Sequence, residues 1–125
     1  TSFGTPTTLP LRASLEKDNL VAFPASLSSL MAQHKHTPPF AAGYNLEAMR
    51  AMDFAVKQAG GPANVKPAII YQGDDYGKDA LAGWKKAAEF HKVSIVSEQS
   101  IKPGQKDFVA TDIVPTAKLP YVLPS

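Results

Sequence analysis

The residues best suited to chemistry lie in the segment 72–79 (QGDDYGKD), where two adjacent aspartates directly follow an apolar run. In an enzyme, Asp74 and Asp75 could bind Mg²⁺ or act as a general acid and base. In a turn from a strand into a helix, one of them would instead cap the helix, and Gly73 and Gly77 would supply unusual backbone angles. The turn is favoured, because no Ser/Thr–Lys partner set for phosphoryl transfer occurs elsewhere.

A second polar group lies at residues 4–8 (GTPTT). Its hydroxyl groups and free backbone N–H groups, placed at a predicted helix start, suit an anionic oxygen ligand. Ordinary helix capping explains the same residues equally well. The segment is not a phosphate loop, because the pattern G-x-x-x-x-G-K-[ST] is absent from the sequence.

The histidines do not form a recognisable metal site. His34 and His36 flank Lys35, and a third ligand at suitable spacing is missing, so an exposed basic loop is predicted there. His91 stands alone where a helix is predicted to end, a position that favours a positive charge. The serines around Ser28 have no patterned His/Asp partners, and no G-x-S-x-G turn occurs. Hydrolase chemistry is therefore not favoured.

Length and composition bound the possible functions. The chain has 125 residues, of which 44% are hydrophobic and 19% charged, a globular balance with the length of one domain. Without cysteine it has no disulfides or thiolate ligands, and a net charge of +2 is too weak to indicate nucleic acid. No apolar run is long enough to span a bilayer. The start lacks Met and a signal peptide, so we expect a piece of something longer.

The elements that position the aspartate loop are predicted clearly. An apolar stripe over residues 46–59 predicts a helix with Asn45 as its N-cap, which Gly60-Gly61-Pro62 ends. The run 68–71 then reads as a buried parallel strand. A further helix is expected over 79–90, with Trp84 on its apolar side, and an alternating strand over 92–96. This order is the βαβ pattern of an open parallel sheet.

The N-terminal third is predicted less sharply. Residues 5–15 suit a helix in which Pro10 must lie early or cause a kink, and 20–23 and 40–44 suit short strands. The strands 20–23 and 68–71 both run into polar or small loops. Ligands of open parallel sheets lie at the carboxyl ends of strands, so we expect a site there. The proline-rich end, residues 115–125, reads as an extended tail.

The segment 66–79 (KPAIIYQGDDYGKD), followed by Gly83 and the predicted strand 93–96, strongly resembles the type I periplasmic binding proteins. The nearest branch is the group of branched-chain amino acid (Leu/Ile/Val)-binding receptors of ABC transporters. Asp107-Phe108 matches a D-F segment of that family, and residues 4–8 and 19–26 are similar to its first-lobe loops. The resemblance covers about residues 2–114.

The resemblance implies an α/β fold with a Rossmann-like parallel sheet and two lobes, both incomplete here. Residues 1–45 would be the C-terminal part of lobe one and the crossover, 46–114 the first βαβ portion of lobe two, and 115–125 stay unplaced. It implies a receptor on the periplasmic or extracellular face that clamps a small carboxylate-bearing ligand and delivers it to a membrane permease. Catalysis, cofactors, metals, nucleic acid and membrane insertion are not implied.

The resemblance also implies the ligand-binding residues. Thr5 falls where a hydroxyl contacts the ligand carboxylate, and Tyr76 falls where a second-lobe aromatic ring closes over the ligand. The remaining residues lie on the polar-head loop or near the crossover; they are Ala25, Ser26, Ser28 and Tyr44. An acidic residue that would hold a ligand ammonium is missing.

Two other functions remain open from the sequence. The first is a small stand-alone α/β enzyme that uses Asp74 and Asp75 with Mg²⁺. The second is a non-transport relative that uses the same lobes for sensing or regulation.

Overall fold

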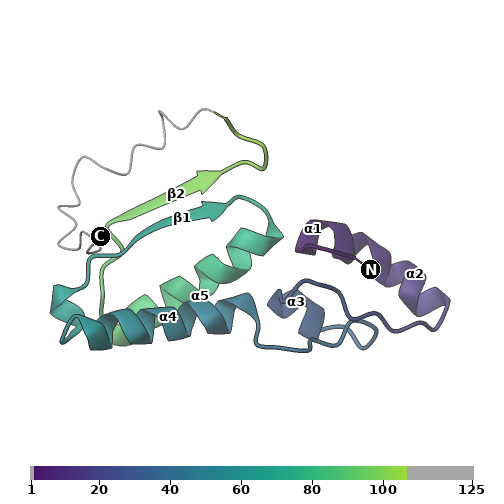
Figure 1. Ribbon diagram of the computed structural model, residues 1–125, viewed down its shortest axis with the longest axis horizontal. Coiled ribbons are helices and arrows are strands. Elements are labelled where there is room, and N and C mark those ends of the chain that lie inside the picture. Colours follow the sequence, from purple (N-terminus) through teal and green to yellow (C-terminus); the bar gives the residue numbers. More distant parts are fainter. Residues whose placement is uncertain (1, 107–125) are drawn as a thin grey trace, which may run out of the picture.

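The computed structural model describes residues 2–106, which form short helical segments followed by a βαβ unit (Figure 1). Asp107-Phe108 and the proline-rich tail lie outside the described residues. The elements are α1 (Thr5–Thr8), η1 (Leu9–Leu11), α2 (Arg12–Lys17), α3 (Ser29–Ala32), α4 (Tyr44–Gln58), η2 (Pro62–Asn64), β1 (Ala68–Gln72), α5 (Asp75–His91) and β2 (Ser97–Ile101).

The predicted parallel pairing is confirmed. β1 and β2 run parallel, with Ala68 opposite Ser97 and Gln72 opposite Ile101, and α5 connects them. The backbone N–H of Gly73 extends the ladder by donating to the Ile101 carbonyl at 2.8 Å. Parallel neighbours require such a crossover, which brings the loop after β1 to the start of α5.

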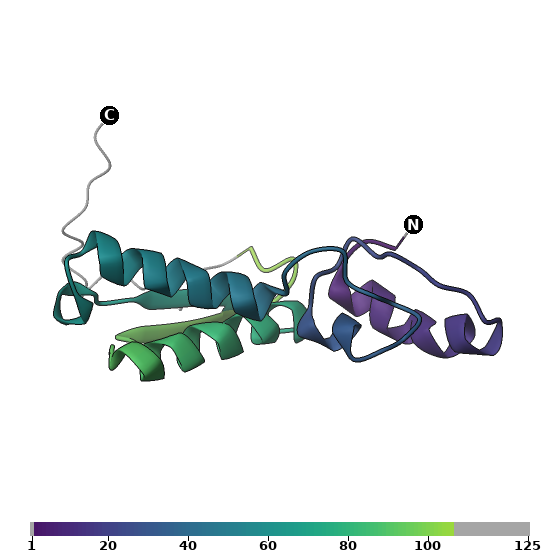
Figure 2. The ribbon, with the colours of Figure 1, turned by 90° about the horizontal axis from the view of Figure 1, so that it is seen from below.

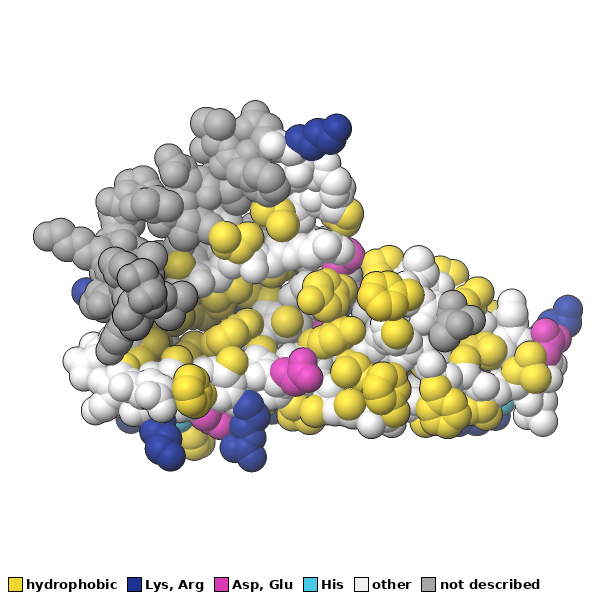
Figure 3. Space-filling view, in the orientation of Figure 1, with side chains coloured by type: hydrophobic (Ala, Val, Ile, Leu, Met, Phe, Trp, Pro, Cys, Tyr) yellow, Lys and Arg dark blue, Asp and Glu magenta, His cyan; other side chains and the backbone are white. Residues whose placement is uncertain are grey.

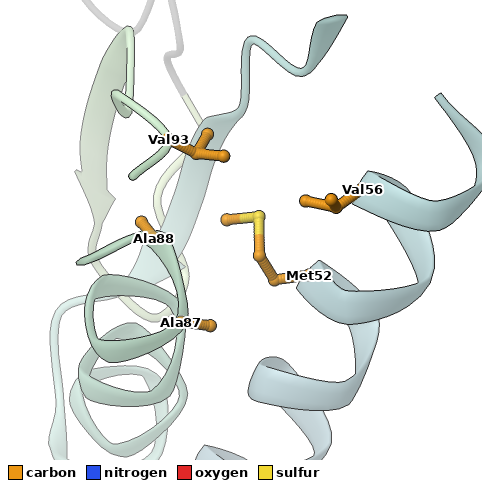
Figure 4. Close-up of a cluster of buried hydrophobic side chains, with 5 residues drawn as sticks. All are labelled: Met52, Val56, Ala87, Ala88 and Val93. Carbon is orange, nitrogen blue, oxygen red and sulfur yellow. The ribbon is translucent and has the colours of Figure 1, made fainter. Parts of the chain in front are cut away.

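Both long helices cover one face of this sheet, as Figures 1 and 2 show. The core between them contains Met52 and Val56 of α4 and Ala87 and Ala88 of α5, closed by Val93 (Figure 4). Trp84 packs against this cluster, as its spacing predicts. Burial of these side chains supplies most of the stabilisation of the helix pair, because apolar area removed from water is the main favourable contribution.

The opposite face of the sheet is open in the described part of the chain. Ile69 of β1 is 6% exposed, whereas its neighbour Ile70 is 57% exposed. The prediction of a fully buried strand is therefore wrong for one of its two faces. Apolar side chains also spread over the N-terminal segment, residues 2–43 (right in Figure 3). Phe3, Phe23 and Phe40 of this segment are all more than half exposed. An isolated domain normally covers more of such surface.

Two predicted strands in the N-terminal third are wrong. Residues 20–23 form no strand; the backbone N–H of Ala22 instead donates to the carbonyl of His36 at 2.9 Å. Residues 40–44 fail as a strand because Tyr44 is already the first residue of α4. Apolar runs of four or five residues carry too little information to specify strands without a pairing partner.

The predicted strand 92–96 is wrong as well, because β2 begins at Ser97. Lys92 takes a left-handed conformation (φ 58°) that ends α5, and Val93 turns into the helix core with 8% exposure. The apolar alternation is real, but it reports packing against the two helices. The chain reaches the sheet only at Ser97.

The two long helices agree with prediction except at their starts, whereas the predicted N-terminal helix does not form as one element. α5 begins at Asp75, four residues before the predicted position, and α4 takes Gly43 as its N-cap in place of Asn45. α4 ends at Gln58, and its C-cap Ala59 directly precedes the predicted glycine stop. The predicted helix 5–15 is broken into α1, η1 and α2, and Pro10 lies in the 3₁₀ turn η1. Proline removes a backbone donor, which a short 3₁₀ turn tolerates.

A hydrogen bond joins the last residue of α5 to the C-terminal half of α4. Nε2 of His91 lies 2.6 Å from Oδ1 of Asp53, so His91 ends its helix as predicted and also bridges to the neighbouring helix. The hydrogen bond from His91 holds the pKa of the Asp53 carboxyl below its ordinary value, and Arg50 at 3.5 Å acts in the same direction.

We expect Asp53→Asn to lower the free energy of unfolding at neutral pH, with a deficit that shrinks in acid. The folded pKa of Asp53 is depressed, so its stabilisation is present above the unfolded pKa of about 3.9 and is lost as the pH falls through the folded value. Urea titrations of both proteins between pH 7 and pH 2 would measure this. A deficit that is the same at every pH would contradict it.

Candidate functional site

Two candidate hydroxyl residues, 21 positions apart in the chain, meet inside the N-terminal segment. Oγ1 of Thr5 lies 2.7 Å from Oγ of Ser26, and both side chains are 0% exposed. A short parallel bridge between Phe3 and Ala25 sets this approach. In it, the N–H of Gly4 donates to the Ala25 carbonyl at 3.1 Å, and the N–H of Ala25 donates to Ser2.

The other two candidates on the same loop, Ser28 and Ala25, have local roles. Ser28 is the N-cap of α3: its hydroxyl accepts from the backbone N–H of Leu30 at 3.3 Å, and its side chain is buried. Ala25 contributes its backbone to the bridge with Ser2 and Gly4. Such capping satisfies helix N–H groups that would otherwise lack partners.

The two candidate tyrosines lie against each other. The rings of Tyr44 and Tyr76 are 4.9 Å apart between centroids and meet edge to face at 86°. Tyr76 keeps 43% of its surface exposed. The backbone N–H of Tyr44 donates to the carbonyl of Leu27 at 3.0 Å, which ties the start of α4 to the loop that carries the serines. The pair thus lies next to the loop that carries Ser26 and Ser28.

The aspartate loop is a helix-capping turn. Oδ1 of Asp74 accepts from the backbone N–H of Gly77 at 3.1 Å, and its other oxygen accepts from the side-chain amide of Gln72. Asp75 is exposed. Gly77 is required, because a Cβ there would lie 2.0 Å from the carbonyl oxygen of Gln72. The geometry confirms the capping interpretation for Asp74 and places Tyr76 one residue before the tight contact.

Sequence reasoning missed a contact between Asp79 and Ser29. One carboxylate oxygen of Asp79 accepts from the backbone N–H of Ser29 at 2.8 Å, and the other accepts from its hydroxyl group. The two residues are 50 positions apart, and the only local signal was a third acidic residue in the segment 72–79. The contact joins the first turns of α5 to the segment that holds the serines.

The histidine loop differs from its prediction at one residue. Lys35 is exposed and lies 3.8 Å from Glu16, as a basic loop requires, but His36 is 5% exposed. Nδ1 of His36 lies 2.7 Å from the carbonyl oxygen of Leu20, which draws the ring inward. Among residues 2–106, no three acidic or histidine side chains gather in a way that could hold a metal ion.

Two hollows of the described surface are not lined by any candidate residue. One is lined by Ser2, Phe3, Thr7 and Leu11 beside α1, and the other lies along α4, between Ala42 and Asp53. The Thr5 and Ser26 hydroxyl groups therefore face each other in the interior, and neither lines one of these hollows. In this arrangement neither hydroxyl group is accessible to solvent.

The family described as "Periplasmic binding protein" matches residues 1–118, and the chain belongs to this family. The comparison with curated proteins gave no match. None of the helices described here is long and apolar enough to cross a membrane.

Two solved structures are similar. A fatty acid ABC transporter substrate-binding protein from Thermomonospora curvata aligns with a TM-score of 0.74 and 22% identity over 87% of this chain and 28% of that chain. A branched-chain amino acid ABC transporter from Thermus thermophilus with bound valine gives 0.73 and 18% identity over 88% and 29%.

The fold is thus that of a type I periplasmic binding protein, and the chain spans under a third of the length of these structures. The family consists of binding proteins, which agrees with the prediction that the chain is not an enzyme.

Proposed function

We propose that this chain belongs to an extracytoplasmic solute receptor of an ABC transporter, which clamps a small carboxylate-bearing ligand and delivers it to a membrane permease. The family supports solute binding. One of the two similar structures is a fatty acid ABC transporter substrate-binding protein and the other contains bound valine, and both kinds of molecule carry a carboxylate. The carboxylate is the chemistry that these ligands share.

The observation that carries the proposal is the convergence of Thr5 and Ser26 at 2.7 Å, in the part of the molecule where α1 contacts α5. Two neutral hydroxyl groups can donate to a carboxylate, and such charge-assisted hydrogen bonds are stronger than neutral ones. Neutral donors also avoid the cost of burying an unpaired cation in the unliganded protein. Ser28 and the backbone of Ala25 lie on the same loop as Ser26. With Thr5 they form the polar side of the proposed clamp.

The other side of the proposed clamp is aromatic. Tyr76 comes from α5, and Tyr44 begins α4, so both rings belong to the βαβ unit and not to the segment that carries Thr5. A tyrosine ring offers apolar area with a polar tip, which suits the aliphatic part of a fatty acid or an amino acid. Closure of the two parts on a ligand would be stabilised by contacts from both.

Calorimetric titration with L-valine and with octanoate tests the proposed function, using this chain and any longer protein that contains it. We expect at least one of the two to bind, and the corresponding primary amide to bind much more weakly because it lacks the charge. A folded protein that binds neither carboxylate, or binds the amide equally well, would argue against the proposal.

We expect Tyr76→Ala to weaken binding of the same carboxylate by roughly 1–3 kcal/mol, the range for loss of a packed aromatic ring. Tyr76→Phe keeps the ring and its edge-to-face contact with Tyr44, so it should retain most of the affinity. Equal losses in both variants would show that the hydroxyl group, and not the ring area, matters.

A further inference from the structure

The contact between Asp79 and Ser29 links two parts of the molecule that also meet where α1 contacts α5 and where Tyr44 bonds to Leu27. Residues 2–43 form the N-terminal segment, and residues 44–106 form the βαβ unit with α4. Asp79 lies in the second turn of α5 and accepts two hydrogen bonds from Ser29, one from the backbone and one from the hydroxyl group. Ionised acceptors make strong hydrogen bonds, and both partners are partly buried here.

This contact holds the start of α5 against the N-terminal segment. α1 contacts α5, and Figures 1 and 2 both show the first turns of these helices side by side. Thr5 is the first residue of α1 and has no exposed surface, like its partner Ser26. Tyr76 lies three residues before Asp79, on the same side of α5. The start of α5 therefore helps to cover the candidate hydroxyl groups.

We propose that Asp79 and Ser29 form a latch that holds α5 over Thr5 and Ser26, so that these hydroxyl groups become accessible only when the latch opens. The latch is a self-inhibitory contact, because it keeps both hydroxyl groups covered. The carboxylate of Asp79 accepts both hydrogen bonds, so a single substitution at Asp79 removes both. On the proposed function, on which this step rests, opening of the latch precedes ligand binding.

The test uses a thiol as a reporter, which is clean because the chain has no cysteine. Ser26→Cys places a thiol of similar size at the covered position, and its rate of reaction with a maleimide reports how often that position is exposed. Ala88→Cys, at a site that is 4% exposed in the core between α4 and α5, reports unfolding of the βαβ unit.

Adding Asp79→Ala should raise the reaction rate at position 26 about tenfold, the factor that loss of a charge-assisted contact typically gives, and leave the rate at position 88 unchanged. Ser29→Pro should act in the same way, because it removes both donors. Proline suits the first position of a helix, and Ser28 already has the extended backbone (ψ 140°) that precedes proline.

Asp75→Ala is the matched control, since Asp75 is exposed and lies on α5, as Asp79 does.

Two results would overturn the latch. One is an unchanged rate at position 26 in both Asp79→Ala and Ser29→Pro. The other is an equal rise at positions 26 and 88, which means general loss of stability. The assay contains no ligand, so it is independent of the proposed function. If the thiol result holds and neither L-valine nor octanoate binds, the latch stands and the proposed function fails.

Discussion

Gly83→Ala should lower the free energy of unfolding by roughly 3 kcal/mol, although alanine is the better helix former by about 1 kcal/mol. Gly83 is buried in the middle of α5, where that helix crosses the start of α4. A Cβ at this position would lie 2.1 Å from the backbone oxygen of Asn45. The obstacle is backbone, so no side-chain rotation can relieve it, and the two helices must move apart.

The sign of the stability change shows whether the clash with α4 outweighs the higher helix propensity of alanine. Lys86→Ala, at an exposed position of the same helix, has no such contact and should change stability by only a few tenths of a kcal/mol. Urea unfolding followed by far-UV circular dichroism measures both variants. A gain in stability for Gly83→Ala would mean that α4 and α5 are farther apart than described.

Such a close approach explains what the sequence can and cannot reveal. The apolar stripes of α4 and α5 predict two helices and the side on which each packs, because burial follows a 3.6-residue period. They do not reveal that Gly83 meets the backbone of Asn45, since that contact depends on how two separate elements cross. Glycine at position 83 is therefore informative only after the fold is known.

The error at residues 92–96 has a related cause. Val93 and Ile95 alternate with polar neighbours, as in a strand with one buried face, but they pack against the core between the two helices. The ladder with β1 begins at Ser97, whose own segment, SEQSI, has little β-forming character. Pairing with β1 overrides that weak preference, because strand formation depends strongly on neighbouring strands.

In the candidate site, too, local features could be predicted from the sequence and long-range contacts could not. The capping role of Asp74 and the C-terminal ends of both long helices follow from local residue types, and the structure confirms them. The pairing of Thr5 with Ser26 and the contact of Asp79 with Ser29 join residues 21 and 50 positions apart. Contacts of that range leave no periodic pattern. The roles of Thr5 and Tyr76 in ligand binding rest on the family resemblance and stay predictions.

The helix pair that carries Tyr44 and Tyr76 depends on one large side chain. Met52 is 0% exposed and reaches from α4 toward Ala88 and Val93, as Figure 4 shows. The other buried members of its cluster are alanines and valines, whose short side chains can fill little of the space that a truncation leaves. A cavity of this kind collapses poorly, and its cost adds to the lost transfer free energy.

Met52→Ala should therefore lower the free energy of unfolding by about 2–5 kcal/mol, the range for truncation of large buried aliphatic side chains. Met52→Leu keeps nearly the same volume and should cost less than about 1.5 kcal/mol. Urea unfolding of both variants at pH 7 gives the two values. If leucine costs as much as alanine, the shape of the Met52 side chain matters more than its volume, and the cavity argument is wrong. If neither substitution has an effect, the contact between α4 and α5 does not stabilise the βαβ unit.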